Sequence, residues 1–512
     1  MKSITANYKS IIVNCITVTL LFTGCNLLET KSNDEYSGQK FWAQGNVQNV
    51  EAFTLSIYNS FRKATLVNSA FMTVSGDFRC APVLSTGSYI SYLTANNMSF
   101  LANTVGNASG WNFLNLTRWK PFYEVVQSAN ILIEEVERVP GITDDEIAAY
   151  SAEAVFMRNL AYFFMVRAWG DVPYYTNAYN SVSLPRTGMV TVLQNCLVDL
   201  QDVIDSDPDA RILPWTYATA NKRAVRASRG SVVALMMHVN MWLAQFDQNN
   251  SDTYYRNTVQ LGNELVTRNE GAYELLALSQ NAEIFAGASR ESIFDVVQDV
   301  GMNEVFLRYA NFSDAVSFSR NNLSLPVVYY NHEFIEQLFP RSEIDLRVTT
   351  WFDEELYSPI SGIMNSNNRK EIIKFFNPAV TSDNVALSNS GNCIIFRYAD
   401  AILLYAEALA ETGNDATACT MLNMIRRRAG ASEVNATGTD LKDTIFWERL
   451  RELIGEGHYY YDMVRTGKIS NMNYCENYIP RSHFNAGAWT LPIHADALIE
   501  NTKMTLNNYW VN

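Results

Sequence analysis

Residues 397–412 read RYADAILLYAEALAET, and residues 413–430 continue as GNDATACTMLNMIRRRAG. The first stretch is rich in alanine and leucine and its apolar residues recur with helical spacing, which predicts a single helix. Gly-Asn-Asp at 413–415 is expected to turn the chain, and 416–429 to form a second helix. Small side chains on one face of the first helix would let a partner helix approach closely, namely Ala399, Ala406 and Ala410.

The helical hairpin predicted at 397–430 is of the kind that stacks in tetratricopeptide repeat proteins. Two other helix pairs, 119–139 with 143–169 and 226–247 with 252–268, are interpreted as degenerate versions of this hairpin. We therefore expect a mainly α fold of tetratricopeptide-like helical hairpins with loop-rich insertions and few short strands.

The remaining secondary structure is predicted from local signals. Thr143 with Glu146 three residues later makes a capping box, which places a helix start there. The other predicted elements are helices at 187–205 and 441–465 and short strands at 292–297 and 372–376.

Two long segments, 71–118 and 299–331, are rich in Asn, Ser, Gly and aromatic residues and show no clear period. We predict that both are long loops. The chain as a whole contains 27 Tyr, 26 Phe and 10 Trp. Many of these rings must pack in the core, and the rest are available to stack on flat faces of a ligand.

The N-terminus has the features of an export signal. Lys2 and Lys9 precede the apolar stretch 11–22, which is too short to span a bilayer. The sequence LFTGC then ends at Cys25 and resembles a lipobox, in which the cysteine is acylated. We predict a lipoprotein signal peptide at 1–24, a polar tether at 25–40 and a helical domain at 41–512. An ordinary secretory peptide with an incidental cysteine is the alternative.

Composition excludes several classes of protein. The formal net charge of −14 and the lack of a basic stripe argue against nucleic-acid binding, which needs Lys and Arg to neutralise phosphates. Five cysteines follow Cys25 at irregular spacing without a C-x-x-C motif, so neither a zinc ribbon nor a disulfide scaffold is indicated. A single disulfide among these five is left open.

The segment 448–465 contains candidates for catalysis. A general acid–base pair or a metal site is one interpretation of its acidic residues and histidine, Glu452, Glu456, His458 and Asp462. The other is a polar network with neighbouring arginines that fixes one helix against the next, and we favour it. Nucleophile-elbow, phosphate-loop and zinc-protease motifs are missing from the sequence, so we predict no catalysis, no metal and no cofactor.

The two predicted loops contain the parts that a sugar-binding surface needs. A pyranose ring stacks its C–H face on an aromatic side chain, while its hydroxyls bond to planar Asn, Asp or Arg groups. For any single residue, packing within the fold is the competing interpretation. The ligand-contact candidates, with Trp111 preferred, are Trp111, Asp77, Arg79, Tyr89, Tyr92, Asn96, Phe306 and Tyr309.

Several segments in order along the chain resemble the SusD/RagB family of nutrient-binding outer-membrane lipoproteins. They are CNLLE at 25–29, WKPFYEVVQSAN at 119–130, AEAVFMRNLAYFFMVRAWGDVP at 152–173, RASRGSVVAL at 226–235, FRYADAILLYAEAL at 396–409, LNMIR at 422–426, ERLRELIGEGHYYYDMVR at 448–465 and WTLPI at 489–493. Each segment alone is weak, but together they span nearly the whole mature chain.

The resemblance implies a helical SusD-like fold whose loop-rich insertions form the ligand face. It also implies a partner, a TonB-dependent outer-membrane transporter of the SusC type that receives the captured glycan. The expected function is therefore that of a non-catalytic glycan-binding lipoprotein, anchored in the outer membrane through Cys25 and facing the cell surface. Oligopeptide capture of the RagB type, a surface hydrolase and a purely structural lid are the alternatives.

Overall fold

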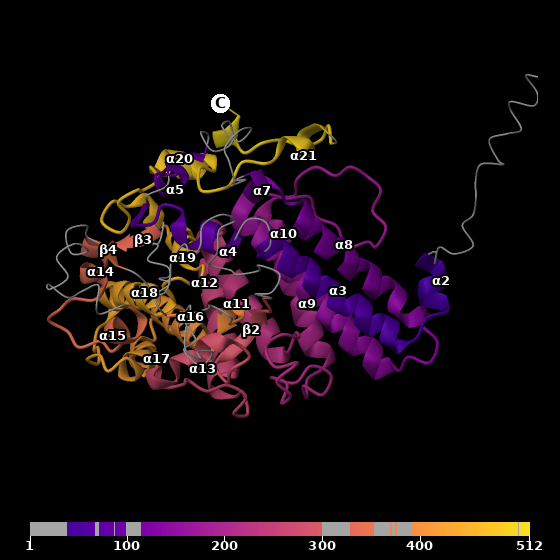
Figure 1. Cartoon of the computed structure of the whole chain (residues 1–512), viewed down its shortest axis with the longest axis horizontal. Coiled ribbons are helices and arrows are strands. Elements are labelled where there is room, and N and C mark those ends of the chain that lie inside the picture. The colour runs from indigo at the N-terminus through magenta and orange to yellow at the C-terminus, as the bar shows by residue number, and fades with distance from the viewer. Residues whose placement is uncertain are drawn as a thin grey trace, which may run out of the picture.

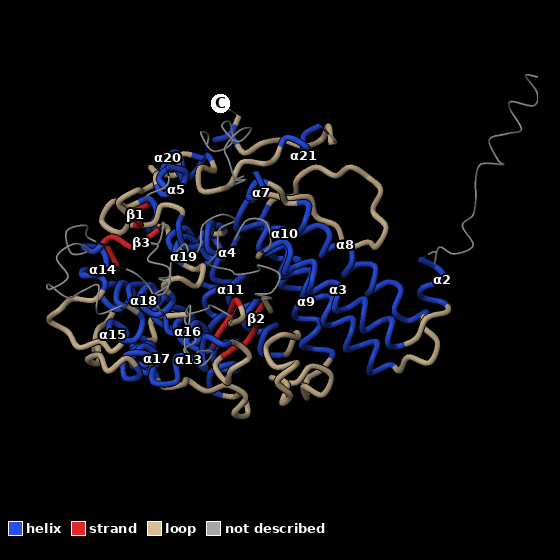
Figure 2. The backbone as a smooth tube through the Cα atoms, in the orientation of Figure 1, coloured by secondary structure: helices blue, strands red, loops and turns tan. Residues whose placement is uncertain are grey.

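The computed structural model of the chain describes residues 38–66, 71–85, 88–98, 114–298, 328–352, 369–370, 374–375, 391–499 and 501–511. Helices make up most of these residues, and strands are confined to two small sheets (Figure 2). The signal peptide predicted at 1–24 lies outside the described residues, as does most of the tether. Residues 38–40 of that tether belong to helix α2 (Gly38–Ala43).

One group of helices packs side by side in the indigo and purple part of Figure 1. Helix α3 contacts α8 and α9, and α9 in turn contacts α10. The helix α3 was not predicted from the sequence, whereas the other three were. The bounds of this group are α3 (Val47–Thr65), α8 (Lys120–Glu135), α9 (Asp144–Trp169) and α10 (Met189–Ser206).

The long helix α9 begins as predicted. The Thr143 side chain accepts a hydrogen bond from the Glu146 backbone, and the Glu146 carboxylate accepts one from the Thr143 N–H at 2.9 Å. From Ala152 to Trp169 every residue of α9 except Val155 is buried, so the helix is covered by neighbours on all sides. Because it is buried all round, α9 shows almost no amphipathic stripe, unlike a surface helix.

A second group of helices follows and contains the predicted hairpin. Helices α16 and α17 form its two arms and pack against each other, which confirms the expectation for 397–430. Helix α16 also contacts α12 and α18, and α11 contacts α12. The bounds are α11 (Arg229–Phe246), α12 (Ser251–Gly262), α16 (Tyr398–Glu411), α17 (Asp415–Arg428) and α18 (Gly438–Leu453).

The helix predicted at 441–465 is in fact two helices. α18 ends at Leu453 and α19 (Tyr459–Arg465) begins after a five-residue break. Gly455 and Gly457 in this break have φ of 81° and 83°, a left-handed conformation that glycine adopts without steric cost. Every residue of α19 is buried, so the helix has no polar face that would mark it off from α18 in the sequence.

The strands form two sheets. Strand β2 (Ser292–Val296) confirms the strand predicted at 292–297 and pairs antiparallel with β5 (Cys393–Arg397), which leads directly into α16. The other sheet has the order β1-β3-β4, with β1 (Val83–Ser85), β3 (Val328–Asn331) and β4 (Arg369–Lys370). Of the strand predicted at 372–376, the structure describes 374–375, which form a turn; the rest lies outside the described residues.

The segments predicted as long loops are partly regular. Within 71–118, the described residues form α4 (Phe71–Thr73), the π-helix η1 (Val74–Phe78), β1, α5 (Ser88–Thr94) and α7 (Leu114–Thr117). Within 299–331, residues 328–331 are strand β3, and 299–327 lie outside the described residues. The loop prediction was wrong for these pieces because each is too short to show a period.

Short elements complete the described part of the chain. The π-helix η4 (Asn263–Thr267) extends α12. The remaining ones are α13 (Asn281–Ala286), α14 (His332–Leu338), α15 (Arg347–Trp351), α20 (Arg481–Ala486), α21 (Ala495–Ile499), and the 3-10 helices η2 (Val136–Arg138), η3 (Gln248–Asn250), η5 (Leu278–Gln280), η10 (Lys468–Ser470) and η11 (Asn508–Trp510).

One continuous core joins the two groups of helices and is rich in aromatic rings. Trp119 and Trp169 are buried as expected, with ring centroids 6.2 Å apart, whereas Trp447 is half-buried. The five cysteines that follow Cys25 are free thiols. Among the described helices, none combines the length and apolar character needed to cross a bilayer.

Candidate functional site

Two of the predicted ligand-contact residues are buried at the π-helix η1. The Asp77 side chain is 1 % exposed and accepts a hydrogen bond from the Gly457 N–H at 2.7 Å. Burial raises the pKa of Asp77 to about 8, which the hydrogen bond from Gly457 opposes. Gly76 lies so close to Gly457 that a Cβ at position 76 would be 2.1 Å from its carbonyl oxygen. Asp77 therefore fixes η1 against the break between α18 and α19.

The other buried candidate, Arg79, binds the backbone of the C-terminal region. Its guanidinium is 1 % exposed and donates to the carbonyls of Ala488, Trp489 and Thr490 at 2.6–2.9 Å. Its Nε donates to Asn96 Oδ1 at 2.9 Å. In this structure Asp77 and Arg79 are core residues with internal partners, so their side chains are out of reach of a surface ligand.

The remaining candidates lie nearer the surface or outside the described part of the chain. Tyr92 and Asn96 are half-buried, and Asn96 has a left-handed φ of 53°. The backbone of Tyr89 belongs to α5, and its side chain lies outside the described residues. Three further candidates lie entirely outside the described residues, namely Trp111, Phe306 and Tyr309.

The sheet β1-β3-β4 brings the two predicted ligand segments together. Val83 to Ser85 come from the first segment and pair antiparallel with Val328 to Tyr330 at the end of the second. These strands are more than two hundred residues apart in sequence, so the pairing fixes both segments to one place on the fold. We refer to the surface around these paired strands, residues 83–85 and 328–330, as the ligand face, after the ligand contacts predicted for the two segments.

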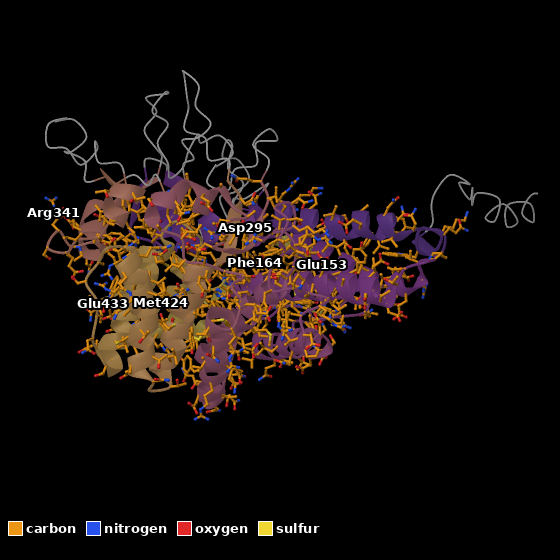
Figure 3. The ribbon with its side chains drawn as sticks, turned by 90° about the horizontal axis from the view of Figure 1, so that it is seen from below. Glu153, Phe164, Asp295, Arg341, Met424 and Glu433 are labelled. Atoms are coloured by element: carbon orange, nitrogen blue, oxygen red, sulfur yellow. The ribbon has the colours of Figure 1, made fainter. Side chains whose placement is uncertain are left out.

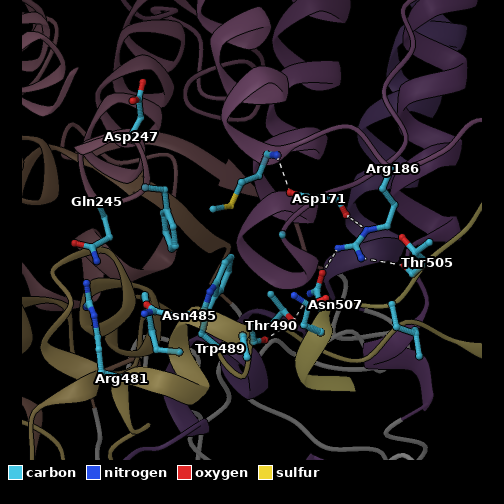
Figure 4. A pocket seen from close by; sticks show the side chains of 18 of the residues that line it. Asp171, Arg186, Gln245, Asp247, Arg481, Asn485, Trp489, Thr490, Thr505 and Asn507 are labelled. Carbon is cyan, nitrogen blue, oxygen red and sulfur yellow. Dashed lines mark hydrogen bonds between the residues drawn. The ribbon is translucent and has the colours of Figure 1, made fainter. Parts of the chain in front are cut away.

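A large cavity lined by described residues includes Trp489 and Thr490, whose backbone carbonyls Arg79 binds. We call it the arm pocket; it has a volume of about 820 Å³. Its walls come from the end of α11, from α20 and the residues that follow it, and from the C-terminal residues 505–508 (Figure 4). Phe246, Phe484 and Trp489 form its aromatic wall, with Phe246 centred 4.9 Å from Trp489.

A set of hydrogen bonds holds residues 501–511, which we call the C-terminal arm, in place beside this pocket. The Arg186 guanidinium donates to the carbonyls of Asp171, Thr505 and Trp169 at 2.7–3.0 Å and also to Asn507 Oδ1. The Asn507 amide in turn donates to the Thr490 hydroxyl at 2.6 Å. The arm is thus tied to the end of α9 through Arg186 and to Thr490 through Asn507 (Figure 4).

The charged residues of 448–465 form a buried network with partners from other elements. Glu452 lies 3.1 Å from Arg347, 2.8 Å from Arg397, and next to Arg428. Lys374 donates to Glu456 at 2.5 Å and to the carbonyls of Glu452 and Ile454. We call this set the buried ion cluster; its members are Glu291, Arg347, Lys374, Arg397, Arg428, Glu448, Glu452 and Glu456.

Electrostatics keeps the carboxylates of this cluster ionised. Burial alone would raise the pKa of Glu452, but Arg428, Arg397 and Arg347 outweigh it and hold that pKa far below its usual range. Burial likewise lowers the pKa of the Lys374 ammonium to about 8, and Glu456 opposes that shift.

The histidine that suggested acid–base chemistry is also in the interior. His458 is buried, and its ring lies 5.8 Å from that of His238, whose Nε2 is 2.7 Å from Asp400 Oδ2. Burial lowers the pKa of His458 to about 4, although Asp400 and Asp462 oppose this shift. The polar-network interpretation of 448–465 therefore agrees with the geometry. Among the described residues, no group of His, Cys, Asp and Glu is arranged to hold a metal ion.

Two family models match the chain. The model described as the SusD family matches residues 353–510, and the model described as "Starch-binding associating with outer membrane" matches residues 83–233. A curated relative, SusD-like protein P38 of Formosa agariphila, is 24 % identical over 94 % of this chain and 95 % of its own length. The alignment with this relative covers nearly the full length of both chains.

Solved structures extend the comparison to the whole fold. A SusD homologue from Bacteroides thetaiotaomicron is 53 % identical and superposes with a TM-score of 0.85, covering 92 % of this chain and 100 % of its own. The surface glycan-binding protein A of the same organism, solved with laminarihexaose, is 21 % identical with a TM-score of 0.65, covering 90 % and 99 %. With this identity, coverage and shared fold, the chain belongs to the SusD family.

Proposed function

We propose that this protein is a cell-surface glycan-binding lipoprotein that captures an oligosaccharide at the ligand face. The observation that carries the proposal is the pairing of β1 with β3, which joins the two aromatic-rich segments predicted to contact ligand. A protein of the same fold has been solved with laminarihexaose bound. Trp111 and the neighbouring aromatic residues would stack on the sugar rings.

The proposal includes an anchor and a partner. A lipid on Cys25 would hold the protein at the outer membrane, with a polar tether after it, and a SusC-type TonB-dependent transporter would receive the captured glycan. Stable anchoring needs more than one acyl chain, which a triacylated cysteine supplies. The family model that matches residues 83–233 is described in terms of the outer membrane, which supports this location.

We propose no catalytic step. The acidic residues and histidine of 448–465 stand in buried ion pairs or beside buried partners, and a substrate at the ligand face would not meet them. Capture followed by transfer needs binding and release alone. Turnover of any bound glycan by the purified protein would overturn this part of the proposal.

Titration calorimetry against neutral oligosaccharides, acidic oligosaccharides and short peptides tests the proposed ligand class. We expect a neutral oligosaccharide to bind, and the Trp111→Ala variant to bind it at least about tenfold more weakly, as expected for loss of an aromatic anchor. Tyr179→Ala is the matched control, because Tyr179 is 56 % exposed and its hydroxyl bonds to Glu135 on α8. Unchanged affinity in a folded Trp111→Ala variant refutes the assignment, and binding of peptides alone favours RagB-type capture.

Membrane fractionation of the Cys25→Ala variant tests the anchor. We expect the variant to leave the membrane fraction, because the acyl chains supply the insertion energy at about 0.8 kcal/mol per CH₂ group. A variant that still fractionates with membranes would show that a protein partner, and not the lipid, holds it there.

A further inference from the structure

The aromatic wall of the arm pocket offers one partly exposed ring, Phe246, which is backed by the buried rings of Phe484 and Trp489. Phe246 is half-buried and stacks on Phe484 with an interplanar angle of 10° and ring centroids 6.0 Å apart. Trp489 packs against Phe246 at 4.9 Å and completes the wall. Rings packed on one another in this way are rigid, so a ligand that contacts them loses little side-chain freedom on their account.

The rim of the pocket holds polar side chains without internal partners. In Figure 4 no dashed line reaches Gln245, Arg481 or Asn485, although all three line the pocket. Within the described part of the chain, these side chains form no hydrogen bond or ion pair. Arg481 lies over the Phe484 ring, 5.3 Å from its centroid, which leaves its N–H groups for another acceptor. Amides and a guanidinium are the planar partners that sugar hydroxyls need.

The charges that line the pocket balance. Asp171 and Asp247 supply two carboxylates, and Arg186 and Arg481 supply two guanidinium groups. Asp247 is engaged with the Tyr254 hydroxyl at 2.7 Å, and Arg186 with the C-terminal arm. A pocket without net charge offers no advantage to a strongly anionic or cationic ligand over a neutral one.

The pocket is also held in its present shape from two sides. Arg79 and Asn96 fix the backbone of 488–490 from within, and Arg186 fixes residues 505–507 from the outer side. Neither set of contacts needs a ligand. A pocket organised in advance in this way binds without a cost of ordering its walls.

From these four observations we infer that the arm pocket is a second saccharide-binding site, which takes a neutral oligosaccharide and is separate from the ligand face. Its volume of about 820 Å³ suits a bound segment of a few sugar rings, within the range of small-molecule pockets. Residues 488–490 lie between the two regions in the contact network, because Arg79 binds their carbonyls and Trp489 and Thr490 line the pocket. A longer glycan held at two places would bind with higher avidity than at either place alone.

Calorimetric stoichiometry with laminarihexaose, maltohexaose, cellohexaose, mannohexaose and xylohexaose tests this inference. We expect roughly two molecules of at least one of these neutral probes to bind at concentrations up to about 1 mM. The double variant Arg481→Ala/Asn485→Ala should bind roughly one, with at least about tenfold loss at the arm site. Both side chains are exposed and lack internal partners, so the variant is expected to fold.

The matched control is Arg427→Ala/Asn435→Ala, which removes an exposed Arg and an exposed Asn at the end of α17 and just beyond it. This control should keep the wild-type stoichiometry. The inference is overturned if the Arg481→Ala/Asn485→Ala variant binds like wild type, or if none of the neutral probes binds. Trp111→Ala is expected to remove the site at the ligand face. If only Trp111→Ala lowers the binding stoichiometry, the arm site is contradicted. If only Arg481→Ala/Asn485→Ala lowers it, the site at the ligand face is contradicted.

Discussion

The buried ion cluster and the arm pocket both contain arginine and carboxylate side chains. The cluster buries and pairs them, whereas the arm pocket leaves polar side chains exposed and without a hydrogen-bond partner. In the cluster, Glu452 faces three guanidinium groups and both Glu452 and Arg347 are fully buried. In the arm pocket, Arg481 and Asn485 are exposed and have no internal partner. Ion pairs at the periphery, such as that of the exposed Glu433 with Arg427, are a third case, because water screens them (Figure 3).

The difference shows that a dense group of charged residues does not by itself mark a functional site. The sequence draws attention to 448–465, where acidic residues and a histidine are crowded, yet their partners come from the fold. The arm pocket is inconspicuous in sequence, because its rim residues are scattered over α11, α20 and the C-terminus. What distinguishes a binding surface is a polar group that the fold leaves without a partner.

The largest effect is expected at the centre of the buried ion cluster. Glu452→Ala would leave Arg347, Arg397 and Arg428 buried without this carboxylate, and breaking a buried ion pair costs about 3–5 kcal/mol. Chemical denaturation should show a correspondingly lower free energy of unfolding. Glu433→Ala, which removes the exposed partner of Arg427, should cost at most about 1 kcal/mol. Equal effects of the two changes would contradict the contrast.

The next effect is on the pH dependence of stability, through the buried histidines. Burial lowers the pKa of His458 from 6.5 to about 4, so between these values the unfolded chain binds more protons than the folded one. Stability should therefore fall as the pH falls from 6.5 to 4, by an amount on the order of 3 kcal/mol for this residue. The neighbouring His238 acts in the same direction, because burial also lowers its pKa.

The thermal midpoint measured above pH 6.5 and near pH 4 checks this expectation. His458→Gln should flatten the profile, whereas the exposed His483→Gln should leave it unchanged. At lower pH a second loss is expected: burial alone would raise the pKa of Asp462, but Arg449 and Arg465 lower it to about 2. That carboxylate stabilises the fold above its unfolded pKa, and its contribution disappears as the pH falls from about 4 to 2.

A smaller and local effect is expected where the fold holds the arm pocket. Arg186→Ala removes the hydrogen bonds that tie residues 505–507 to the end of α9 and should cost about 2 kcal/mol. Hydrogen exchange should accelerate in residues 501–511 while the amides of α16 keep their protection. Arg268→Ala, at an exposed position after η4, is the matched control. Uniform acceleration across the whole chain would show that the arm is part of the global core.

The smallest effect on stability is expected at the rim of the arm pocket. Arg481→Ala/Asn485→Ala should change the free energy of unfolding by no more than about 0.5 kcal/mol, because neither side chain has an internal hydrogen-bond or ion-pair partner and the contact of Arg481 with the Phe484 ring is at the surface. Denaturation curves of this variant and of wild type should therefore coincide. A loss as large as that of Glu452→Ala would assign these residues to the scaffold and not to a binding surface.

Most of the helical scaffold could be predicted from local sequence, and each element that was missed has its own physical cause. The capping box at Thr143 and the hairpin at 397–430 were found because cap and period lie within a few residues. The break at Gly455 and Gly457 was missed because buried residues continue on both sides of it, although the two glycines adopt left-handed φ angles. Strand β5 was missed because its partner β2 is about a hundred residues earlier, and no local signal records that pairing.

The candidate site was predicted less well than the scaffold, since exposure depends on tertiary contacts. Asp77 and Arg79 have the right chemistry for a sugar, and their segment does reach the ligand face. Both side chains turn inward because Gly457 and the 488–490 backbone offer them partners nearly four hundred residues away. The assignments of Trp111, Phe306, Tyr309 and Tyr89 stay predictions, and so do those of Tyr92 and Asn96.

The contacts of Arg79 with residues 488–490 also bear on the order in which the chain can fold during synthesis. The two partners are separated by 410 positions, from Arg79 to Trp489. Ribosomes add about 5–20 residues per second, so Arg79 emerges roughly 20–80 s before its acceptors. For that interval residues 488–490 do not yet cover η1. The Arg79 guanidinium and the apolar side chains beside it then face solvent or a chaperone. The core around Arg79 is therefore completed only after residues 488–490 have been made.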